Sequence, residues 1–414
     1  MNEIGQKIRT LRKERRLTLQ ALAGEGLSIG MLSLIENGKA QPSMESLHYI
    51  AEQLSVDVSV LLNDKRQENL KQILLEAERI TAEYSEFQKN EALEKQFFAL
   101  LDPIIESLKM QTYEEIRLQD LYYRYKWNGI SDEAVAKIVE LIQQYKHVHA
   151  YGKVLKTYNY LYWRYFLEQD YKEAMKYLLQ AEQELEGFSL LVDDLSRIDL
   201  YYNLTIVSLA VFDDEKTKYY FEKAMAISRE KKIYYRIDDL YRLMFGISMN
   251  EEDYEKARYY IGKYKLFVEF ADDFVMKCFM KLWEVHYVNI VEKAHEKAIQ
   301  MIDEIEEEAK HNVGTISKEL FNIERTYALY MQGHYKEALA IAQTITVPDY
   351  ILHPFDLSLF YRLISIRAIC YAKLGHKAEA MRDSEYAVSS MEAYPIGYYK
   401  KCILSIDEEI QHLV

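Results

Sequence analysis

The densest group of chemically active side chains in this chain is a run of basic residues near its amino terminus. Six of the seven basic residues in positions 1–63 fall between Lys7 and Arg16. The same segment has seven acidic residues, so residues 64–414, with 45 basic and 59 acidic side chains, carry the whole net charge of −14. A concentrated positive stretch on one helix can neutralise phosphates, whereas the acidic remainder would repel them. The alternative is a solvated helix face without a partner.

Residue patterns for catalysis or metal binding are missing from the sequence. It contains no HExxH, no paired CxxC, no GxSxG and no glycine-rich phosphate loop. His147 and His149 are the closest histidine pair, but side chains at positions i and i+2 of a helix do not share a face. We therefore expect a protein that is not an enzyme, with no catalytic residues, no metal ligands and no cofactor.

Amino-acid composition restricts the fold class of the protein and the cellular compartment in which it is expected. Only 5 prolines and 14 glycines leave little room for disorder or for a β-rich fold. Cys278, Cys370 and Cys402 are odd in number and far apart, which indicates reduced thiols in the cytoplasm. The amino terminus has no apolar core of signal-peptide length, and no run approaches the ~18–20 apolar residues of a membrane span. We expect a cytoplasmic, all-α protein that does not contact a membrane.

Residues 1–63 predict five short helices. Thr18 is a candidate N-cap of the second helix, and Ser28 is a candidate N-cap of the third. Glycines within residues 24–26 supply the turn between these two helices, and Pro42-Ser43 opens the fourth.

The order of these residues resembles the helix-turn-helix of the phage-repressor class. The matching positions are Leu17-Thr18, Leu22-Ala23, Ser33-x-Ile35-Glu36-x-Gly38, Pro42-Ser43, Leu47, Ala51-x-x-Leu54 and Leu61-Leu62. In that fold the third helix lies in the major groove and the second crosses the DNA backbone. The resemblance implies that the groove-facing residues are Ser28, Ile29, Gly30, Met31 and Ser33. Other predicted DNA contacts are Gln20 on the second helix, Lys39 and Gln41 beside phosphate, and Arg12 and Arg16 of the basic cluster.

Two features depart from the phage-repressor pattern. The pattern commonly has Gln directly after Leu-Thr, where this chain has Leu19. Groove-facing positions are usually polar, but this chain offers Ile29, Gly30 and Met31. Apolar groups can touch a thymine methyl but cannot make the bidentate hydrogen bonds that discriminate bases. The alternative interpretation is a retained helical domain whose sequence readout is weakened or lost.

Short helical phrases recur along the rest of the chain, each with a small residue at an anchor position. The anchors are Ala92, Ala134, Ala174, Thr217, Ala257, Ala298, Ala338 and Ala380. The steps between them are 42, 40, 43, 40, 41, 40 and 42 residues. The copies around Ala92 and Ala134 are the least regular, and the alternative for them is a distinct connecting bundle. A fixed period of this size predicts stacked helix pairs, with small residues where neighbouring helices cross. Such solenoids form extended concave surfaces, so we expect binding rather than catalysis.

These repeats resemble tetratricopeptide repeats, lengthened beyond the usual period of about 34 residues. The predicted fold is therefore all-α, with an N-terminal phage-repressor-type helix-turn-helix domain followed by a right-handed tetratricopeptide-repeat superhelix. The predicted divisions are a DNA-binding domain at 1–63, a helical linker at 64–80, about eight helix pairs at 81–394 and a C-terminal capping helix at 395–414.

The combination resembles the peptide-pheromone-responsive regulators of Gram-positive bacteria, the Rgg, PlcR, PrgX and NprR class. Length and number of repeats are most similar to the NprR type. The resemblance implies a homodimeric transcription regulator that binds double-stranded DNA. Its concave groove would bind a short signalling peptide, which would alter DNA binding or oligomeric state. The alternative is a scaffold or phosphorelay-interacting protein that acts by binding another protein, with a weak or vestigial DNA-binding domain.

An extended peptide needs its backbone N–H and C=O groups paired, and asparagine offers both a donor and an acceptor. Asn159, Asn203 and Arg242 lie 15, 14 and 15 residues before their anchors, so we expect them at equivalent positions on first helices. Arg362 would receive a peptide carboxylate. The full predicted peptide-binding set is Asn159, Tyr162, Asn203, Arg242, Trp283, Asn322, Arg325, Tyr361 and Arg362, with Tyr162, Trp283 and Tyr361 forming apolar side pockets. The alternative for each is an ordinary solvated residue or a residue of the core between repeats.

Overall fold

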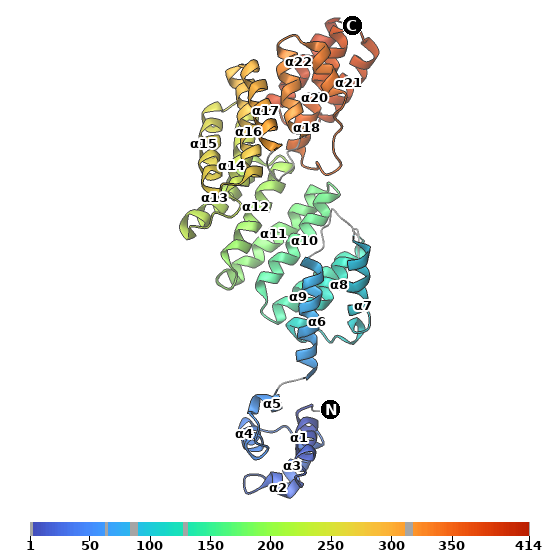
Figure 1. The fold of residues 1–414 in the computed structure, drawn as a ribbon, viewed down its shortest axis with the longest axis vertical. Helices are drawn as coiled ribbons and strands as arrows, with labels where there is room; N and C mark the ends of the chain where they lie inside the picture. The colour runs from blue at the N-terminus through green and yellow to red at the C-terminus, as the bar shows by residue number, and fades with distance from the viewer. Residues whose placement is uncertain (1–2, 63–64, 83–89, 127–130, 311–317, 414) are drawn as a thin grey trace. The chain divides into compact units, whose positions relative to one another are not determined.

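The computed structural model of the chain describes residues 3–62, 65–82, 90–126, 131–310 and 318–413. Helices connected by short turns make up these ranges, which contain no strand (Figure 1). The predicted all-α fold is therefore confirmed. The chain divides into two compact units, Met1–Ala150 and Tyr151–Val414. Within the described ranges, no helix combines the length and the apolarity that crossing a membrane requires.

Five short helices form the N-terminal domain. They are α1 (Glu3–Glu14), α2 (Leu19–Ala23), α3 (Ile29–Glu36), α4 (Met44–Gln53) and α5 (Val58–Leu62). Their apolar faces meet in one core, whose buried residues include Ile8, Leu22, Leu32, Ile35, Leu47, Ile50, Leu54 and Leu61. Both predicted N-caps are confirmed, because Thr18 and Ser28 each accept a hydrogen bond of 3.0 Å from the backbone N–H three residues ahead. Ser43 does the same at the start of α4, at 3.1 Å.

Four more helices complete the unit that ends at Ala150. They are α6 (Lys65–Ala82), α7 (Glu91–Leu101), α8 (Tyr113–Lys126) and α9 (Asp132–His147). The segment predicted as a helical linker falls on α6, which buries Leu70, Leu74, Ala77 and Ile80 in a core shared with α7 and α8. This helix is therefore a packed part of the body that follows it. The predicted domain boundary at residues 63 and 64 lies outside the described residues.

Six helix pairs follow one another in the described part of the second unit. The first helices of the pairs are α10 (Tyr151–Leu167), α12 (Asp194–Ala210), α14 (Ile237–Asn250), α16 (Phe274–Tyr287), α18 (Lys318–Met331) and α20 (Pro354–Lys373). The second helices are α11 (Tyr171–Phe188), α13 (Asp214–Lys231), α15 (Tyr254–Ala271), α17 (His295–Ala309), α19 (Tyr335–Ala342) and α21 (Lys377–Ser390). Each helix contacts the next along the chain, and α22 (Tyr398–Leu413) packs on α20 and α21. The pairs therefore stack in sequence order.

Small anchor residues lie near the starts of the second helices, as the repeat pattern predicts. Their exposed fraction is at most 2% at Ala174, Thr217, Ala257, Ala298, Ala338 and Ala380. Ala134 is also buried, on α9. The anchor assigned to Ala92 was wrong, because α7 turns Phe97 and Leu101 into its core and leaves Ala92 exposed.

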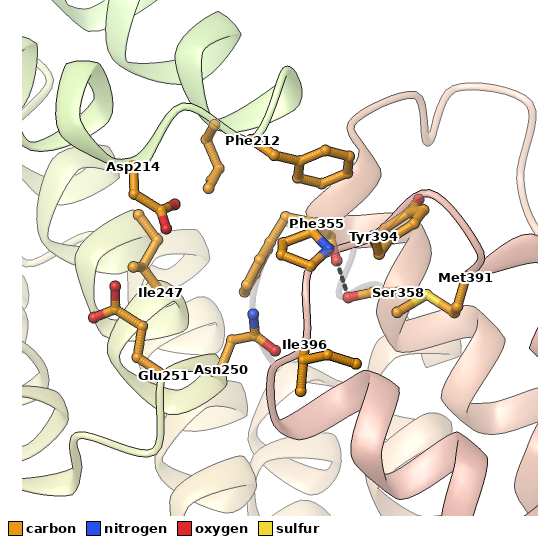
Figure 2. Close-up of a pocket in the computed structure, with 12 residues that line it drawn as sticks. Phe212, Asp214, Ile247, Asn250, Glu251, Phe355, Ser358, Met391, Tyr394 and Ile396 are labelled. Atoms are coloured by element: carbon orange, nitrogen blue, oxygen red, sulfur yellow. Dashed lines mark hydrogen bonds between the residues drawn. The ribbon is translucent and has the colours of Figure 1, made fainter.

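The late helices of the second unit contact its early ones. α20 contacts α12, and α22 contacts α14. The Nε2 atom of His353, just before α20, donates to the carbonyl oxygen of Ile206 in α12 at 3.1 Å, across 147 residues of sequence. The backbone N–H of Tyr399 donates to the Asn250 side chain at 3.4 Å, across 149 residues. The array of pairs therefore curves until early and late helices meet. Figure 2 shows Asn250, at the end of α14, beside Phe355 and Ile396 of the late part.

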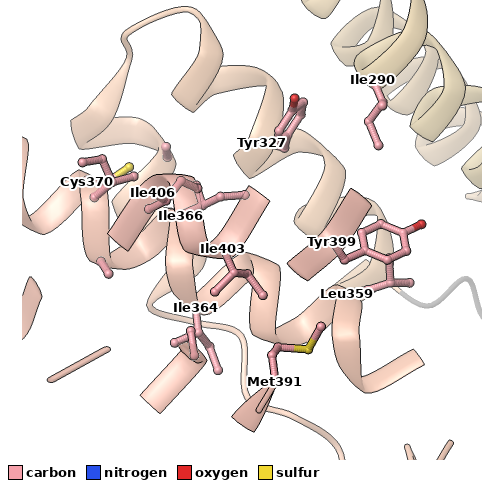
Figure 3. Close-up of a cluster of buried hydrophobic side chains, with 14 of the residues drawn as sticks. Ile290, Tyr327, Leu359, Ile364, Ile366, Cys370, Met391, Tyr399, Ile403 and Ile406 are labelled. Carbon is pink, nitrogen blue, oxygen red and sulfur yellow. The ribbon is translucent and has the colours of Figure 1, made fainter. Parts of the chain in front are cut away.

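A large apolar core closes the carboxyl end of the second unit (Figure 3). It joins residues of α20, α21 and α22 to residues of α14, α16 and α18. Ile403, Ile406 and Ile410 of α22 are buried in it, whereas Leu413 at the end of the helix is exposed. The amphipathic spacing of these isoleucines thus places α22 as the last layer of the stack.

Candidate DNA-binding face and ligand-binding sites

The third helix is held against α1 by a close backbone crossing and an ion pair. A Cβ atom on Gly5 would meet the carbonyl oxygen of Ile35 at 2.0 Å, so the crossing requires glycine. Beside it, Arg12 of α1 and Glu36 of α3 form a bidentate pair, with Nε–Oε1 at 2.6 Å and Nη2–Oε2 at 2.8 Å. Arg12 Nη1 also donates to the carbonyl oxygen of Leu17 at 2.9 Å. These contacts fix the orientation of α3 in the domain.

This geometry corrects the prediction that Arg12 contacts DNA. Its side chain is 12% exposed, and the side chain of Glu36 is 4% exposed. The hydrogen bonds that Arg12 donates to Glu36 raise the pKa of Arg12 above its ordinary value. A nearly buried carboxylate needs a paired cation, so Arg12 has an internal role. The neighbouring Arg16 is exposed and has a left-handed backbone, with φ of 56°.

The turn between α2 and α3 packs on a tyrosine of α4 that the sequence analysis did not single out. A Cβ on Gly24 would meet the hydroxyl of Tyr49 at 2.2 Å, and one on Gly26 would meet its ring at 2.4 Å. The N–H of Gly26 donates to that hydroxyl at 3.0 Å. Gly24 also has a φ of +51°, which favours glycine. The two glycines therefore allow Tyr49 to set the angle between α2 and α3.

The outward face of α3 is apolar and exposed. Ile29, Met31 and Leu34 have exposed fractions of 48%, 44% and 44%. A Cβ on Gly30 would meet nothing within 4 Å, so the fold of the domain does not require glycine there. Exposed apolar side chains grouped on one short helix suit contact with thymine methyl groups or with a protein surface.

The polar residues of the predicted DNA-binding set flank this face. Ser28 is exposed at the N-cap of α3, and Gln20 is exposed on α2. Lys39 and Gln41, which follow α3, are exposed as well. Ser33 is half-buried. These side chains are accessible to a ligand, and Ser33 is the least accessible of them.

Three of the predicted peptide-binding residues occupy successive first helices. Asn159, Asn203 and Arg242 lie on α10, α12 and α14, and each is half-buried. The Oδ1 atom of Asn159 is buried and accepts no hydrogen bond from the described residues. Arg242 pairs with Asp239 of its own helix and lies 4.6 Å from the ring of Phe279. The Asn159 oxygen is therefore an acceptor that a ligand N–H could satisfy.

The predicted aromatic side pockets differ from one another in burial. Tyr162 and Trp283 are buried, with the Tyr162 ring against Phe166 of the same helix and the Trp283 ring against Phe245 of α14. Burial raises the pKa of the Tyr162 hydroxyl. Tyr361 and Asn322 are half-buried.

Arg325 of α18 is paired within the protein. Its Nη1 and Nη2 atoms contact Asp303 and Glu306 of α17, at 2.6 Å and 2.9 Å. The guanidinium therefore links the two helices, and a peptide would have to compete with these carboxylates for it.

Arg362 lies in a buried network rather than on a groove surface. Its side chain is fully buried and its Nη2 atom pairs with Glu324. Glu324 also accepts hydrogen bonds from His286 Nδ1 at 2.8 Å and from Asn289 Nδ2 at 3.0 Å. The hydroxyl of Tyr399 lies 3.0 Å from His286 Nε2. Five helical elements thus meet around one internal carboxylate.

Burial and the neighbouring charges shift the pKa values of Glu324 and His286. Burial alone would raise the pKa of Glu324, but the charge of Arg362 and the contact with His286 lower it. Burial lowers the pKa of His286 and favours the neutral ring. Since an ionised carboxylate only accepts, Nδ1 of His286 carries the proton and Nε2 accepts from Tyr399. The expectation that Arg362 receives a peptide carboxylate is corrected, because its side chain is fully buried and its Nη2 atom pairs with Glu324.

Asn289 is a member of this network that sequence analysis missed. It lies in the π-helical turn Val288–Glu292 between α16 and α17. Nothing in the local sequence signals this turn. It aims the Asn289 amide at both the side chain and the backbone carbonyl of Glu324, at 3.0 Å and 3.1 Å.

A cavity of about 90 Å³ lies between early and late elements of the second unit (Figure 2). Asp214 and Glu251 supply its carboxylates, from the start of α13 and the end of α14. Phe212, Phe355 and Tyr394 supply aromatic walls. None of the predicted peptide-binding residues lines this cavity. Among the described residues, no cluster of His, Cys, Asp or Glu has an arrangement that would hold a metal ion.

Comparison of the sequence with protein-family models finds a match in the N-terminal domain. Residues 8–61 match the family model HTH_3, described as Helix-turn-helix. No curated protein matches the chain.

Several solved structures show a distant likeness. Bacillus thuringiensis PlcR in complex with the peptide PapR7 and DNA is 18% identical, with a TM-score of 0.33. The match covers 76% of this chain and 100% of that one. ComR from S. thermophilus in complex with DNA and its signalling peptide ComS is also 18% identical, with a TM-score of 0.30 and coverage of 67% and 97%. The Streptococcus dysgalactiae SHP pheromone receptor Rgg2 is 15% identical, with a TM-score of 0.29 and coverage of 66% and 97%. The family match on residues 8–61 and the five-helix core together establish that the N-terminal domain of this chain is a helix-turn-helix domain.

Proposed function

We propose that this protein is a cytoplasmic, homodimeric transcription regulator that binds operator DNA and is gated by a short signalling peptide. The observation that carries the proposal is the third helix of the helix-turn-helix domain. It is fixed by Gly5 and by the Arg12–Glu36 pair, and its outward face is exposed. Length and repeat number support the NprR type among peptide-responsive regulators.

The apolar face of α3 favours a particular kind of operator. Ile29, Met31 and Leu34 can contact thymine methyl groups in the major groove. The open space around Gly30 allows a close approach of the DNA to the start of the helix. We therefore expect half-sites rich in A·T pairs at the positions that α3 faces.

The test begins with selection of genomic fragments by the purified full-length chain. Specific enrichment that collapses as salt is raised supports operator binding through phosphate contacts. Replacing a contacted thymine by uracil removes one methyl group, which is worth about 0.8 kcal/mol, or about fourfold in affinity. Met31→Ala should abolish that fourfold effect. Leu75→Ala, which removes an exposed leucine of α6, is the matched control and should leave it unchanged.

The repeat array supports the peptide part of the proposal. A buried acceptor without a partner, as on Asn159, costs free energy that a ligand N–H recovers. An extended peptide presents such N–H groups along its backbone. The affinity for the selected operator should therefore change when a spent-medium peptide fraction is added. Asn159→Ala should weaken this response, whereas Lys156→Ala, on the exposed side of the same helix, should not.

A second candidate function is a scaffold or phosphorelay-interacting protein that acts by protein binding. The observation that favours it is the same apolar face of α3, because apolar side chains also suit a protein partner. Selection that enriches no sequence, even at low salt, would support this alternative and contradict operator binding.

A further inference from the structure

We infer that the cavity in Figure 2 is a subsite for a cationic group on an apolar stem, carried by a short peptide. The group is a lysine or arginine side chain or an N-terminal ammonium, which share the same chemistry. This inference rests on the proposed peptide ligand and adds the charge of one of its residues.

The carboxylates of the lining and its aromatic rings at Phe212 and Tyr394 are on different sides of the cavity. Figure 2 shows Asp214, Ile247 and Glu251 on one side, and Phe212 and Tyr394 across from them. A positive charge is attracted both to carboxylates and to the faces of aromatic rings within about 6 Å. An apolar stem gains free energy against the aromatic and aliphatic side chains. The arrangement therefore fits an amphipathic cation.

The lining excludes an anionic ligand. Its charged residues are the two carboxylates, and it contains no Lys, Arg or His. Lys218 pairs with Glu251 at 3.0 Å from the surface side, where the two side chains are 52% and 33% exposed. An exposed pair of this kind contributes little free energy, so a ligand cation can take the place of Lys218.

The volume limits the ligand to one residue. A water molecule requires at least about 10–15 Å³ of cavity volume, so a cavity of about 90 Å³ holds on the order of six water molecules. This room suits one long side chain, or one terminal residue, and not a whole peptide. The rest of a peptide would lie outside this cavity.

Close packing holds two residues of the lining, Phe355 and Asn250, in place. Phe355 packs on α14 where Gly246 leaves room, because a Cβ there would meet the ring at 2.6 Å. Asn250 is held under Gly397, whose Cβ would meet the amide at 2.5 Å, and it accepts from the Tyr399 N–H. Lining residues that are already held in place reduce the ordering cost of binding a ligand.

The test uses the full-length chain and three pools of synthetic pentapeptides with C-terminal amides. The first pool is N-acetylated and contains one lysine, and the second replaces that lysine with norleucine. The third is the norleucine pool with a free amino terminus. Calorimetry should show at least about tenfold tighter binding by the first or the third pool than by the second. Tighter binding by the first identifies a basic side chain, and by the third an N-terminal ammonium.

Matched variants test whether the preference for cationic peptides arises at the cavity. Asp214→Asn and Glu251→Gln should each reduce the tenfold preference to less than about threefold. Glu215→Gln and Glu252→Gln, at neighbouring carboxylates outside the lining, should retain it. Ile396 is 65% exposed at the edge of the cavity, so Ile396→Lys should fold normally and place a competing ammonium there. This variant should lose the preference too.

Two results would overturn the inference. One is equal or undetectable binding of all three pools by the wild-type chain, and the other is a preference that survives Asp214→Asn and Glu251→Gln. Neither result decides the proposed function, because the response of operator binding to spent-medium peptides is measured separately.

Discussion

Replacing Arg12 with alanine should unfold the helix-turn-helix domain, because it leaves a buried carboxylate without its cation. Glu36 is 4% exposed, and its two oxygens accept from two nitrogens of the same guanidinium. The third contact of Arg12, to the carbonyl of Leu17, is lost as well. No other cation is seen paired with Glu36 in the described part of the chain.

The expected loss of stability is comparable to the whole stability of the domain. Removing one partner of a buried ion pair costs about 3–5 kcal/mol. A domain of roughly sixty residues has about 3–9 kcal/mol of stability, at 0.05–0.15 kcal/mol per residue. The Arg12→Ala variant should therefore populate an unfolded N-terminal domain under native conditions. Replacing both members by apolar residues, as in Arg12→Met with Glu36→Leu, should restore folding because neither charge remains.

Hydrogen exchange with mass spectrometry on the full-length chain measures this effect. Peptides from α1–α5 should lose protection in Arg12→Ala and regain it in the double variant, while peptides from α10–α22 serve as the internal reference. Arg16→Ala is the matched control, because Arg16 is exposed and its removal should change stability by no more than about 0.5 kcal/mol.

One result would refute this reasoning. If Arg12→Ala keeps wild-type protection and lowers only the salt dependence of DNA binding, by about 0.9 in the slope, Arg12 is a phosphate contact. The internal role assigned to it from the ion pair would then be wrong.

Three further predictions concern the second unit. Burial lowers the pKa of His286 below its ordinary 6.5, so only the unfolded ring takes up a proton near pH 6, and the melting temperature should fall from pH 7 to pH 5. In His286→Gln the dependence of the melting temperature on pH should flatten. An unchanged dependence would contradict the neutral, buried state of His286. Glu324→Gln leaves the buried guanidinium of α20 without a counter-charge and should destabilise the unit by about 3–5 kcal/mol in urea unfolding; a change below 1 kcal/mol would contradict this. Gly246→Ala should cost about 1–3 kcal/mol, since its Cβ would lie 2.6 Å from Phe355, whereas Gly262→Ala, with open space on α15, should be neutral or stabilising by up to about 1 kcal/mol.

Local features of the chain could be predicted because they depend on residues close in sequence. Thr18 and Ser28 cap their helices through hydrogen bonds to the third residue ahead, and such caps show in the sequence as a residue type at a helix start. The period of small residues from Ala174 to Ala380 likewise predicts where helices cross, because each crossing repeats the same geometry. Ala92 failed this test, since α7 packs in a different core.

The cavity could not be predicted from the repeat pattern. Its carboxylates and its aromatic residues come from turns and helix ends that are distant in sequence, such as Asp214 and Tyr394. Only the curvature of the array, set by packing between many helices, brings them together. The Asn159 acceptor, in contrast, lies on a first helix where the pattern placed it, although its lack of a partner required coordinates.

The helical class, the helix-turn-helix segment and the stacking order of the repeats follow from the amino-acid sequence, because periodic apolar and small residues act over short distances along the chain. The roles of the charged residues depend on contacts that form only in the folded chain. Arg12 and Arg16 are both arginines of the same basic cluster. Only Arg12 pairs with Glu36, which lies 24 residues further along the chain, and the pair is packed inside the domain. Arg362 likewise meets Glu324 across 38 residues in the core. A charge is either a surface group or an internal one according to the partner that folding places beside it, and that partner comes from a distant segment.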